Sequence, residues 1–196
     1  MNVKSLTTSS RFPLIGEPLS IDLVNTRICR DGSEIDLLDA PAALTAWLAA
    51  EASRHPWSGA AAASDLQAVR ALRDAIAVLF STRRSGVPPP RAALRAINKI
   101  LSTSASTTKL VWTSAAGPRV RVQAAMSKRD ALLHALALDA VGILTGPQAR
   151  LLRTCEHPDC VLQFLAHNPR RRWCSAAVCG NRARVARHYL RQRTNG

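Results

Sequence analysis

The chain has 196 residues, of which 47% are hydrophobic and 20% charged, a balance typical of one globular core with a small appendage. Its net charge of +14 and pI near 11.2 favour a polyanionic partner such as nucleic acid. No apolar stretch is long enough to cross a bilayer and no signal peptide is apparent, so we expect a cytoplasmic protein with reduced cysteines and no membrane contact.

The first elements follow a polar leader of eleven residues. Residues 18–27 alternate hydrophobic and polar side chains, which predicts a short strand or an irregular buried segment. Asp39 stands where it would cap a helix that begins at Ala40-Pro41. The first domain is therefore expected to begin with one strand followed by helices.

The clearest helix is predicted to open at Ser64 and to end at Ser85-Gly86. Its hydrophobic residues recur at three- and four-residue steps: Leu66, Val69, Leu72, Ile76, Leu79 and Phe80. A second helix follows the proline run at 88–90, and two β-branched runs at 108–113 and 119–124 predict a hairpin. Ser127 and Asp130 resemble a capping box that opens a further helix, which Gly146-Pro147 ends.

Four of the five cysteines form two pairs near the C-terminus. Cys155 pairs with Cys160 and Cys174 with Cys179, each across a gap of four residues. Four thiolates from two short loops can close a tetrahedron around one structural Zn²⁺ and leave no open position for catalysis. The spacing therefore predicts one zinc ion held by these four residues.

Other interpretations of the cysteines remain open at this point. Disulfides would require an exported protein, and His157 or His167 could replace one thiolate. Oxidation of the thiolates could also eject the metal and unfold the module. Cys29 stands apart and is expected to be a small buried hydrophobic residue, with a redox role as the alternative.

A basic helix is predicted to follow the last cysteine, with Gly180 allowing the chain to turn and Asn181 as its N-cap. One side gathers Val185, Ala186, Tyr189 and Leu190, and we expect it to pack against the cysteine loops and Phe164 or Trp173. The predicted nucleic-acid contacts are Arg170, Arg171, Arg172, Arg182, Arg184, Arg187, His188 and Arg191. The alternative is a solvated face that only keeps the protein soluble.

The run Cys179-Gly180-Asn181-Arg182 resembles the motif for which the CGNR zinc-finger family is named, and the similarity extends over nearly all of residues 150–193. Residues 19–26 resemble the hallmark of the ABATE domain that commonly precedes this finger. The resemblance implies a bacterial transcription regulator, often described as stress-induced, whose finger binds DNA.

The expected fold class is α+β and mostly helical, with a small hairpin. It comprises an ABATE-like domain at 12–146 and a four-cysteine zinc module with a basic C-terminal helix at 150–193. Within the ABATE-like motif, Asp22, Asn25 and Thr26 either contact a small-molecule effector or supply turn and cap hydrogen bonds.

The predicted function is transcription regulation through double-stranded DNA binding, with the first domain used for sensing or for forming a homodimer. Two alternatives stay open: RNA binding by the same module, and a small-molecule binder in which zinc is only a structural clasp. No nucleophile triad order, P-loop or dinucleotide fingerprint is present, so we expect no enzymatic activity.

Overall fold

A computed structural model describes residues 11–55, 57–102, 106–113, 117–124 and 126–194. The helices are α1 (Leu19–Val24), α2 (Pro41–Ala50), η1 (Ala52–Arg54), α3 (Ala63–Ser85), α4 (Arg91–Leu101), α5 (Lys128–Thr145), η2 (Pro147–Leu151) and α6 (Cys179–Thr194). The strands are β1 (Arg27–Arg30), β2 (Ser33–Asp36), β3 (Ser106–Thr113), β4 (Gly117–Ala124), β5 (Leu152–Thr154) and β6 (Gln163–Leu165), paired as three antiparallel hairpins. The leader at 1–10 and the 114–116 part of the predicted hairpin turn lie outside the described residues.

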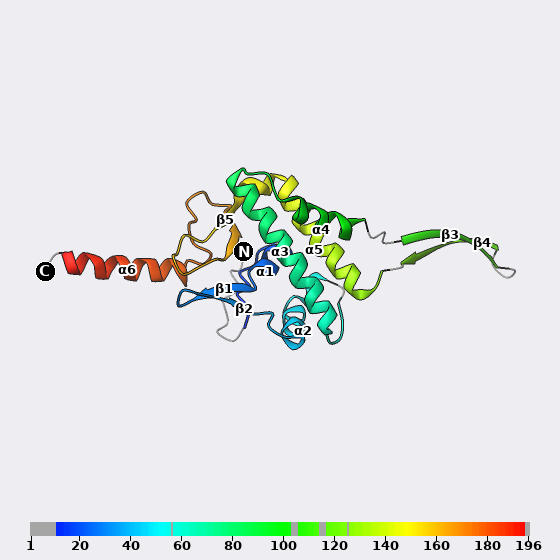
Figure 1. Cartoon of the computed structure of the whole chain (residues 1–196), viewed down its shortest axis with the longest axis horizontal. Helices are drawn as coiled ribbons and strands as arrows, with labels where there is room; N and C mark the ends of the chain where they lie inside the picture. Colours follow the sequence, from blue (N-terminus) through cyan, green and yellow to red (C-terminus); the bar gives the residue numbers. More distant parts are fainter. Residues whose placement is uncertain (1–10, 56, 103–105, 114–116, 125, 195–196) are drawn as a thin grey trace.

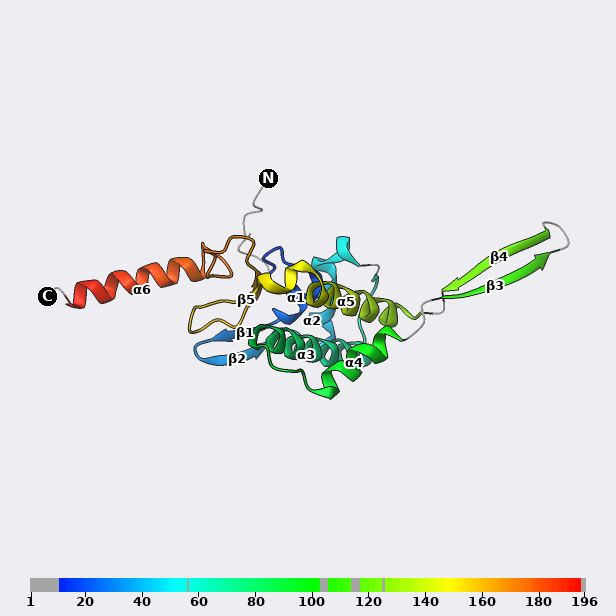
Figure 2. The ribbon, with the colours of Figure 1, turned by 90° about the horizontal axis from the view of Figure 1, so that it is seen from above.

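The helical body lies in the middle of an elongated molecule, with the β3–β4 hairpin extending from one end and α6 from the other (Figures 1 and 2). The mostly helical fold class is confirmed. No helix in the described ranges combines the length and apolar character that a membrane span requires.

Helices α3, α4 and α5 pack on one another and form the main core. The predicted apolar stripe of α3 is buried, because hydrophobic residues at helical spacing share one face. The predicted helix ends also hold: Gly86 takes the left-handed conformation (φ +71°) after α3, and Ser127 Oγ accepts from Asp130 N (3.1 Å) at the start of α5. The predicted cap Asp39 instead pairs with Arg11, and α2 has no side-chain cap.

For residues 18–27 a short strand or an irregular buried segment was predicted; the strand is wrong, whereas the burial of residues 19–26 is confirmed. Residues 19–24 form the short helix α1, and every one of them is buried between α3, α5 and β6. Hydrophobic periodicity distinguishes a helix from a strand only when one face of the element is exposed to water. Because α1 is surrounded on all sides, its alternating pattern did not distinguish the two. Ser20 N donates to Asp139 of α5 (2.9 Å), which provides a partner for one polar group of this buried turn.

The β1–β2 hairpin was not predicted. Asp31 and Gly32 form its two-residue turn with φ of +52° and +75°, the conformation that tight hairpins favour. Arg73 of α3 is only 1% exposed and donates to both carboxylate oxygens of Asp36 in β2 (2.7 and 2.8 Å). Burial disfavours ionisation of Asp36, but the hydrogen bonds and charge of Arg73 outweigh it and lower the pKa of the carboxyl.

The β5–β6 hairpin belongs to two cores at once. Leu152 and Leu165 pack into the helical core, whereas Phe164, the neighbour of Leu165, packs among the cysteines. Successive residues of a strand point to opposite faces, so a strand of three residues serves both sides. The cysteine-rich segment is therefore joined to the first domain by a shared hairpin.

Candidate metal centre and nucleic-acid interface

The four predicted ligands converge on one point. The sulfur atoms of Cys155, Cys160, Cys174 and Cys179 all lie within 4.8 Å of one another. Cys174 Sγ lies 3.8 Å from Cys160 Sγ and 3.6 Å from Cys179 Sγ. With zinc–sulfur bonds of about 2.3 Å, two ligands of a tetrahedral site stand about 3.8 Å apart, so the arrangement fits Zn²⁺. None of the five cysteines, all of which lie within the described residues, forms a disulfide, which does not favour the disulfide interpretation.

Backbone hydrogen bonds shape the two cysteine loops, the first at residues 155–162 between β5 and β6 and the second at residues 166–178 between β6 and α6. Cys155 N donates to Leu162 O (2.8 Å), and Cys160 N donates to His157 O (3.0 Å), which closes the first turn. Cys174 N donates to Cys155 Sγ (3.4 Å) and ties the second loop to the first. The loops thus aim their sulfurs inward through local turn geometry and not through long regular elements.

The four thiols of the cluster are close enough to shift one another's pKa values. Hydrogen bonds from Cys160 and Cys174 lower the pKa of Cys155, whereas the hydrogen bond with Cys155 raises the pKa of Cys160 to about 12 and raises that of Cys174. One thiolate is thus stabilised at the cost of the others. Four sulfurs this close ionise together only when a cation compensates their charge, as a bound divalent metal does.

The predicted docking of the apolar side of α6 is wrong. Val185, Tyr189 and Leu190 are 46%, 62% and 62% exposed, and the helix extends away from the body (Figures 1 and 2). Asn181 is not the N-cap either, because α6 begins at Cys179 and Ser175 Oγ accepts from Val178 N (3.3 Å) just before it. The sequence pattern is amphipathic, but only the first turn of α6 touches the cysteine loops.

Gly180 lies in this first turn and not in a bend. A Cβ atom at Gly180 would stand 3.1 Å from the Trp173 ring, so the ring packs directly on the helix backbone. Gly180 was predicted to allow the chain to turn; in the structure it allows the indole of Trp173 to approach the helix backbone.

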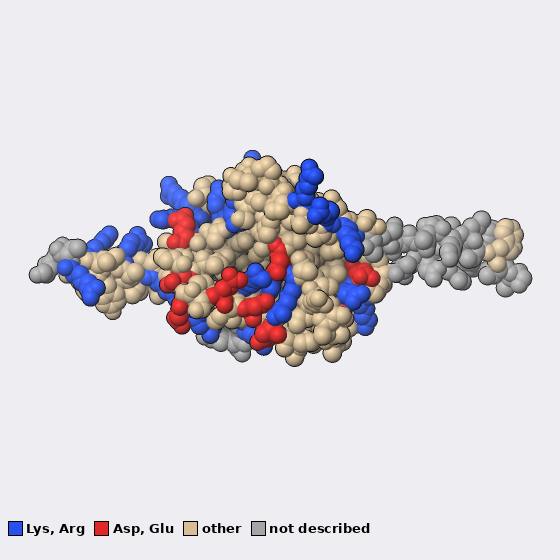
Figure 3. Space-filling model, in the orientation of Figure 1, with Lys and Arg blue, Asp and Glu red and all other residues tan. Residues whose placement is uncertain are grey.

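Most of the predicted nucleic-acid contacts are exposed. Those on the surface are Arg170, Arg172, Arg182, Arg184, Arg187, His188 and Arg191. No acidic residue follows Asp159 in the chain, so α6 carries five arginines and no carboxylate. Figure 3 shows the result: acids and bases mix over the body, whereas only basic charge marks α6.

Arg171 is placed differently from its neighbours. Its guanidinium donates to Cys174 O (2.7 Å) and Leu165 O (3.2 Å), lies 4.2 Å from the centre of the Phe164 ring and pairs with Glu17 (3.1 Å). These contacts join the second cysteine loop to β6 and to the first domain. Among the arginines predicted to contact nucleic acid, Arg171 is therefore the one whose contacts hold the loop in place.

Asn25 makes the most direct link between the motif at 19–26 and the cysteine-rich segment. Its side chain donates to Gln163 O (3.0 Å) and accepts from Gln163 N (2.8 Å), so the amide pairs with β6 as a neighbouring strand would. Glu17 accepts from Leu165 N (2.9 Å), and Arg84 of α3 donates to the Gln163 side chain (2.9 Å). No sequence pattern singled out Glu17, Arg84 or Gln163, because hydrogen-bonding partners far apart in the chain leave no local signal.

Comparison with protein families accounts for both parts of the chain. The ABATE family, described as a "putative stress-induced transcription regulator", matches residues 17–147, and the CGNR zinc finger family matches residues 151–192. The chain belongs to the ABATE family. A search of curated proteins gives no match. Neither family description names a catalytic activity.

The remaining residues of the ABATE motif are bonded within the domain. Thr26 Oγ1 donates to Leu23 O (2.7 Å) and accepts from Arg73 (3.0 Å). Asp22 pairs through Oδ2 with Arg54 (2.8 Å), while its Oδ1 is buried without a hydrogen-bond partner. Burial raises the pKa of Asp22 to about 7, although the hydrogen bond with Arg54 opposes the shift.

We expect Asn25→Ala to lower the free energy of unfolding by about 3 kcal/mol, because it leaves a buried N–H and C=O of β6 without partners. Urea denaturation followed by circular dichroism measures this loss. Asn168→Ala is the matched control, since Asn168 is exposed and accepts one bond from Arg170 N within its own turn. Equal stability of the two variants would contradict a bonding role for the ABATE asparagine.

We expect the stability of the wild type to fall as pH rises from about 4 to about 7 through Asp22. In this range the folded carboxyl holds a proton that the unfolded chain has released, so rising pH favours unfolding. Asp22→Asn removes the titration and keeps an oxygen for Arg54. Unfolding free energies measured at pH 5 and pH 8 should therefore differ less in the variant, and an unchanged difference would contradict a raised pKa.

Proposed function

We propose that this protein is a transcription regulator that binds double-stranded DNA through α6 and the basic loop before it. One structural Zn²⁺, held by Cys155, Cys160, Cys174 and Cys179, fixes the start of that helix. The ABATE domain supplies the body that senses a signal or forms a homodimer. This assignment places the protein in the bacterial cytoplasm and gives it no enzymatic activity.

One observation carries the proposal: α6 extends from the body with an all-basic set of charges and is not covered by any other described element. A helix of 16 residues is about 24 Å long and can enter a DNA major groove about 12 Å wide. A helix kept only for solubility would not need to extend from a metal-dependent fold. Phosphate contact follows from the charge, whereas base reading requires a fixed register.

The contacts proposed for DNA fall into two groups. Arg184, Arg187, His188 and Arg191 form one side of α6, with Arg182 near its start. Arg170 and Arg172 stand on the second cysteine loop; Arg172 lies 5.2 Å from the Trp173 ring and pairs with exposed Glu156, a contact that phosphate can replace. Arg171 is left out of the interface because its guanidinium holds the loop together.

We expect purified protein to contain one zinc per chain and to lose stability when a chelator removes it. Since β5–β6 is shared between the zinc finger and the ABATE core, chelation should lower the melting temperature of the whole chain and not only unfold the tail. Metal analysis and thermal melting followed by circular dichroism test this. Cys160→Ser should lose the metal and Cys29→Ser should keep it; a metal-free wild type with an ordered C-terminal quarter would refute the zinc site.

We expect the triple variant Arg184→Gln, Arg187→Gln, Arg191→Gln to bind random duplex DNA more weakly than the wild type. The slope of log affinity against log salt should become less steep by roughly three, since each phosphate contact contributes about 0.9. The matched control replaces Arg83, Arg91 and Arg95, exposed arginines of α3 and α4, with glutamine.

Equal slopes for the two triple variants would favour the second candidate, a small-molecule binder with a structural zinc clasp. Competition between duplex DNA and structured RNA distinguishes DNA binding from the third candidate function, RNA binding. Displacement of the protein by RNA alone would favour an RNA-binding role for the same basic helix.

A further inference from the structure

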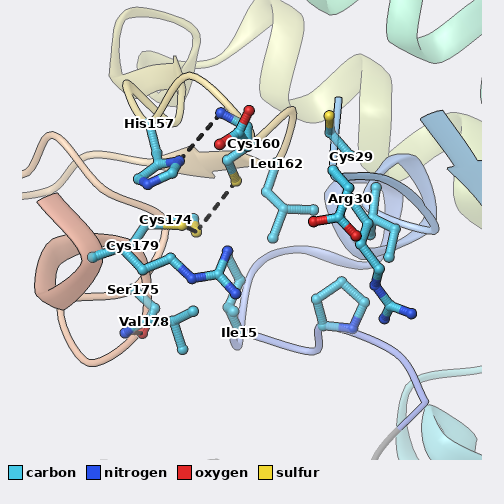
Figure 4. Close-up of a pocket in the computed structure, with 15 residues that line it drawn as sticks. Ile15, Cys29, Arg30, His157, Cys160, Leu162, Cys174, Ser175, Val178 and Cys179 are labelled. Carbon is cyan, nitrogen blue, oxygen red and sulfur yellow. Dashed lines mark hydrogen bonds between the residues drawn. The ribbon is translucent and has the colours of Figure 1, made fainter. Parts of the chain in front are cut away.

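A cavity of about 460 Å³ lies between the ABATE domain and the zinc finger, beside their shared contacts. Its walls come from three segments: the chain before α1, the β1 strand with its turn, and the two cysteine loops up to the start of α6 (Figure 4). This volume lies within the range of 300–1,000 Å³ that is common for small-molecule sites. Such sites often occur where two domains meet, as this one does.

Each of the three segments contributes apolar surface to the cavity. Ile15 comes from the N-terminal segment, Ile28 from β1, and Leu162 and Val178 from the zinc finger. Ile15 and Ile28 are only partly buried against the small core around the cysteines. An apolar ligand placed here would complete this core and would remove these side chains from water.

The charges around the cavity decide which ligand fits. Two arginines, Arg30 and Arg182, and two aspartates, Asp31 and Asp159, line it and cancel formally. Cys160, Cys174 and Cys179 line the same cavity, and a zinc ion with four thiolates carries a formal charge of −2. With the proposed metal in place, the lining is therefore negative, although the protein as a whole is strongly positive.

We propose that this cavity binds a small amphipathic cation, with its apolar part against Ile28, Leu162 and Val178 and its ammonium-type group toward the aspartates and the zinc-bound sulfurs. The proposal rests on the zinc site of the proposed function, because the −2 charge comes from it. This cavity is not the effector site considered for the ABATE motif. The side chains of Asn25 and Thr26 in that motif form hydrogen bonds within the protein.

The position of the cavity gives such a ligand access to α6. Val178 and Arg182 flank Cys179, where α6 begins, while Ile28 and Asp31 belong to the ABATE hairpin. A ligand between them touches the first turn of α6 and the body at the same time. Its binding energy therefore depends on how α6 is held relative to the body, which is the requirement for an effector.

Two fluorescent probes of one skeleton and opposite charge test the proposal: 1-naphthylmethylammonium and 1-naphthoate, titrated into zinc-loaded full-length protein by isothermal calorimetry. We expect one cation to bind per chain and the anion to bind at least about tenfold more weakly. Val178→Trp fills the cavity at a surface position and should abolish binding of the cation. Asp31→Asn with Asp159→Asn should weaken it about fivefold, and Glu34→Gln, an exposed acid of the same hairpin outside the cavity, should not.

Zinc content measured on the same samples separates two kinds of failure. A metal-free protein would overturn the zinc site and, with it, the charge of the cavity. Zinc-loaded protein that binds neither probe, that binds both equally, or that binds the cation unchanged in Val178→Trp would overturn the cavity proposal alone.

Discussion

The convergence of four sulfur atoms on one point is the constraint on which the C-terminal quarter of the chain depends. Between β5 and α6 the chain has a single three-residue strand, so few backbone hydrogen bonds hold its loops. A segment this short cannot bury enough apolar surface to offset its ordering entropy unaided. A closed tetrathiolate zinc site would contribute the missing energy directly, because the unfolded chain has no preformed site for the ion.

The cysteine cluster is packed against the first domain and is not a separate unit at the end of the chain. The β5–β6 hairpin gives Leu165 to the helical core and Phe164 to the cysteine core, while Asn25 pairs with the strand edge. Arg171 and Glu17 add an ion pair across the same boundary. The ABATE motif and the zinc finger are therefore joined by hydrogen bonds and an ion pair.

The exposure of α6 follows from where its contacts with the cysteine loops end. Beyond its first turn the helix leaves the cysteine loops, so Tyr189 and Leu190 stay in solvent together with the arginines. With five arginines and no carboxylate, such a helix attracts polyanions electrostatically, and few contacts with the body stabilise it. Contact with DNA would stabilise it, whereas contact with another copy would bring like charges together. The cavity beneath its start is where the proposed cationic ligand would contact it.

Local sequence patterns determined those features that depend on neighbouring residues. The cysteine spacing, the apolar stripe of α3, the glycine end of that helix and the Ser127 cap each involve groups within a few positions of one another, so they could be read without the fold. The four converging cysteines and the basic helix were likewise predictable from spacing and charge.

Tertiary structure alone decided what depends on surroundings. Residues 19–24 form a helix that is buried on every side, and their alternating pattern did not indicate a helix. Arg171 bonds inward while Arg170 and Arg172 stay exposed, although the three are identical in type and adjacent. The exposed apolar side of α6, the pairing of Asn25 with Gln163 and the cavity at the domain boundary each arise from segments distant in the chain, and such contacts leave no trace in local periodicity.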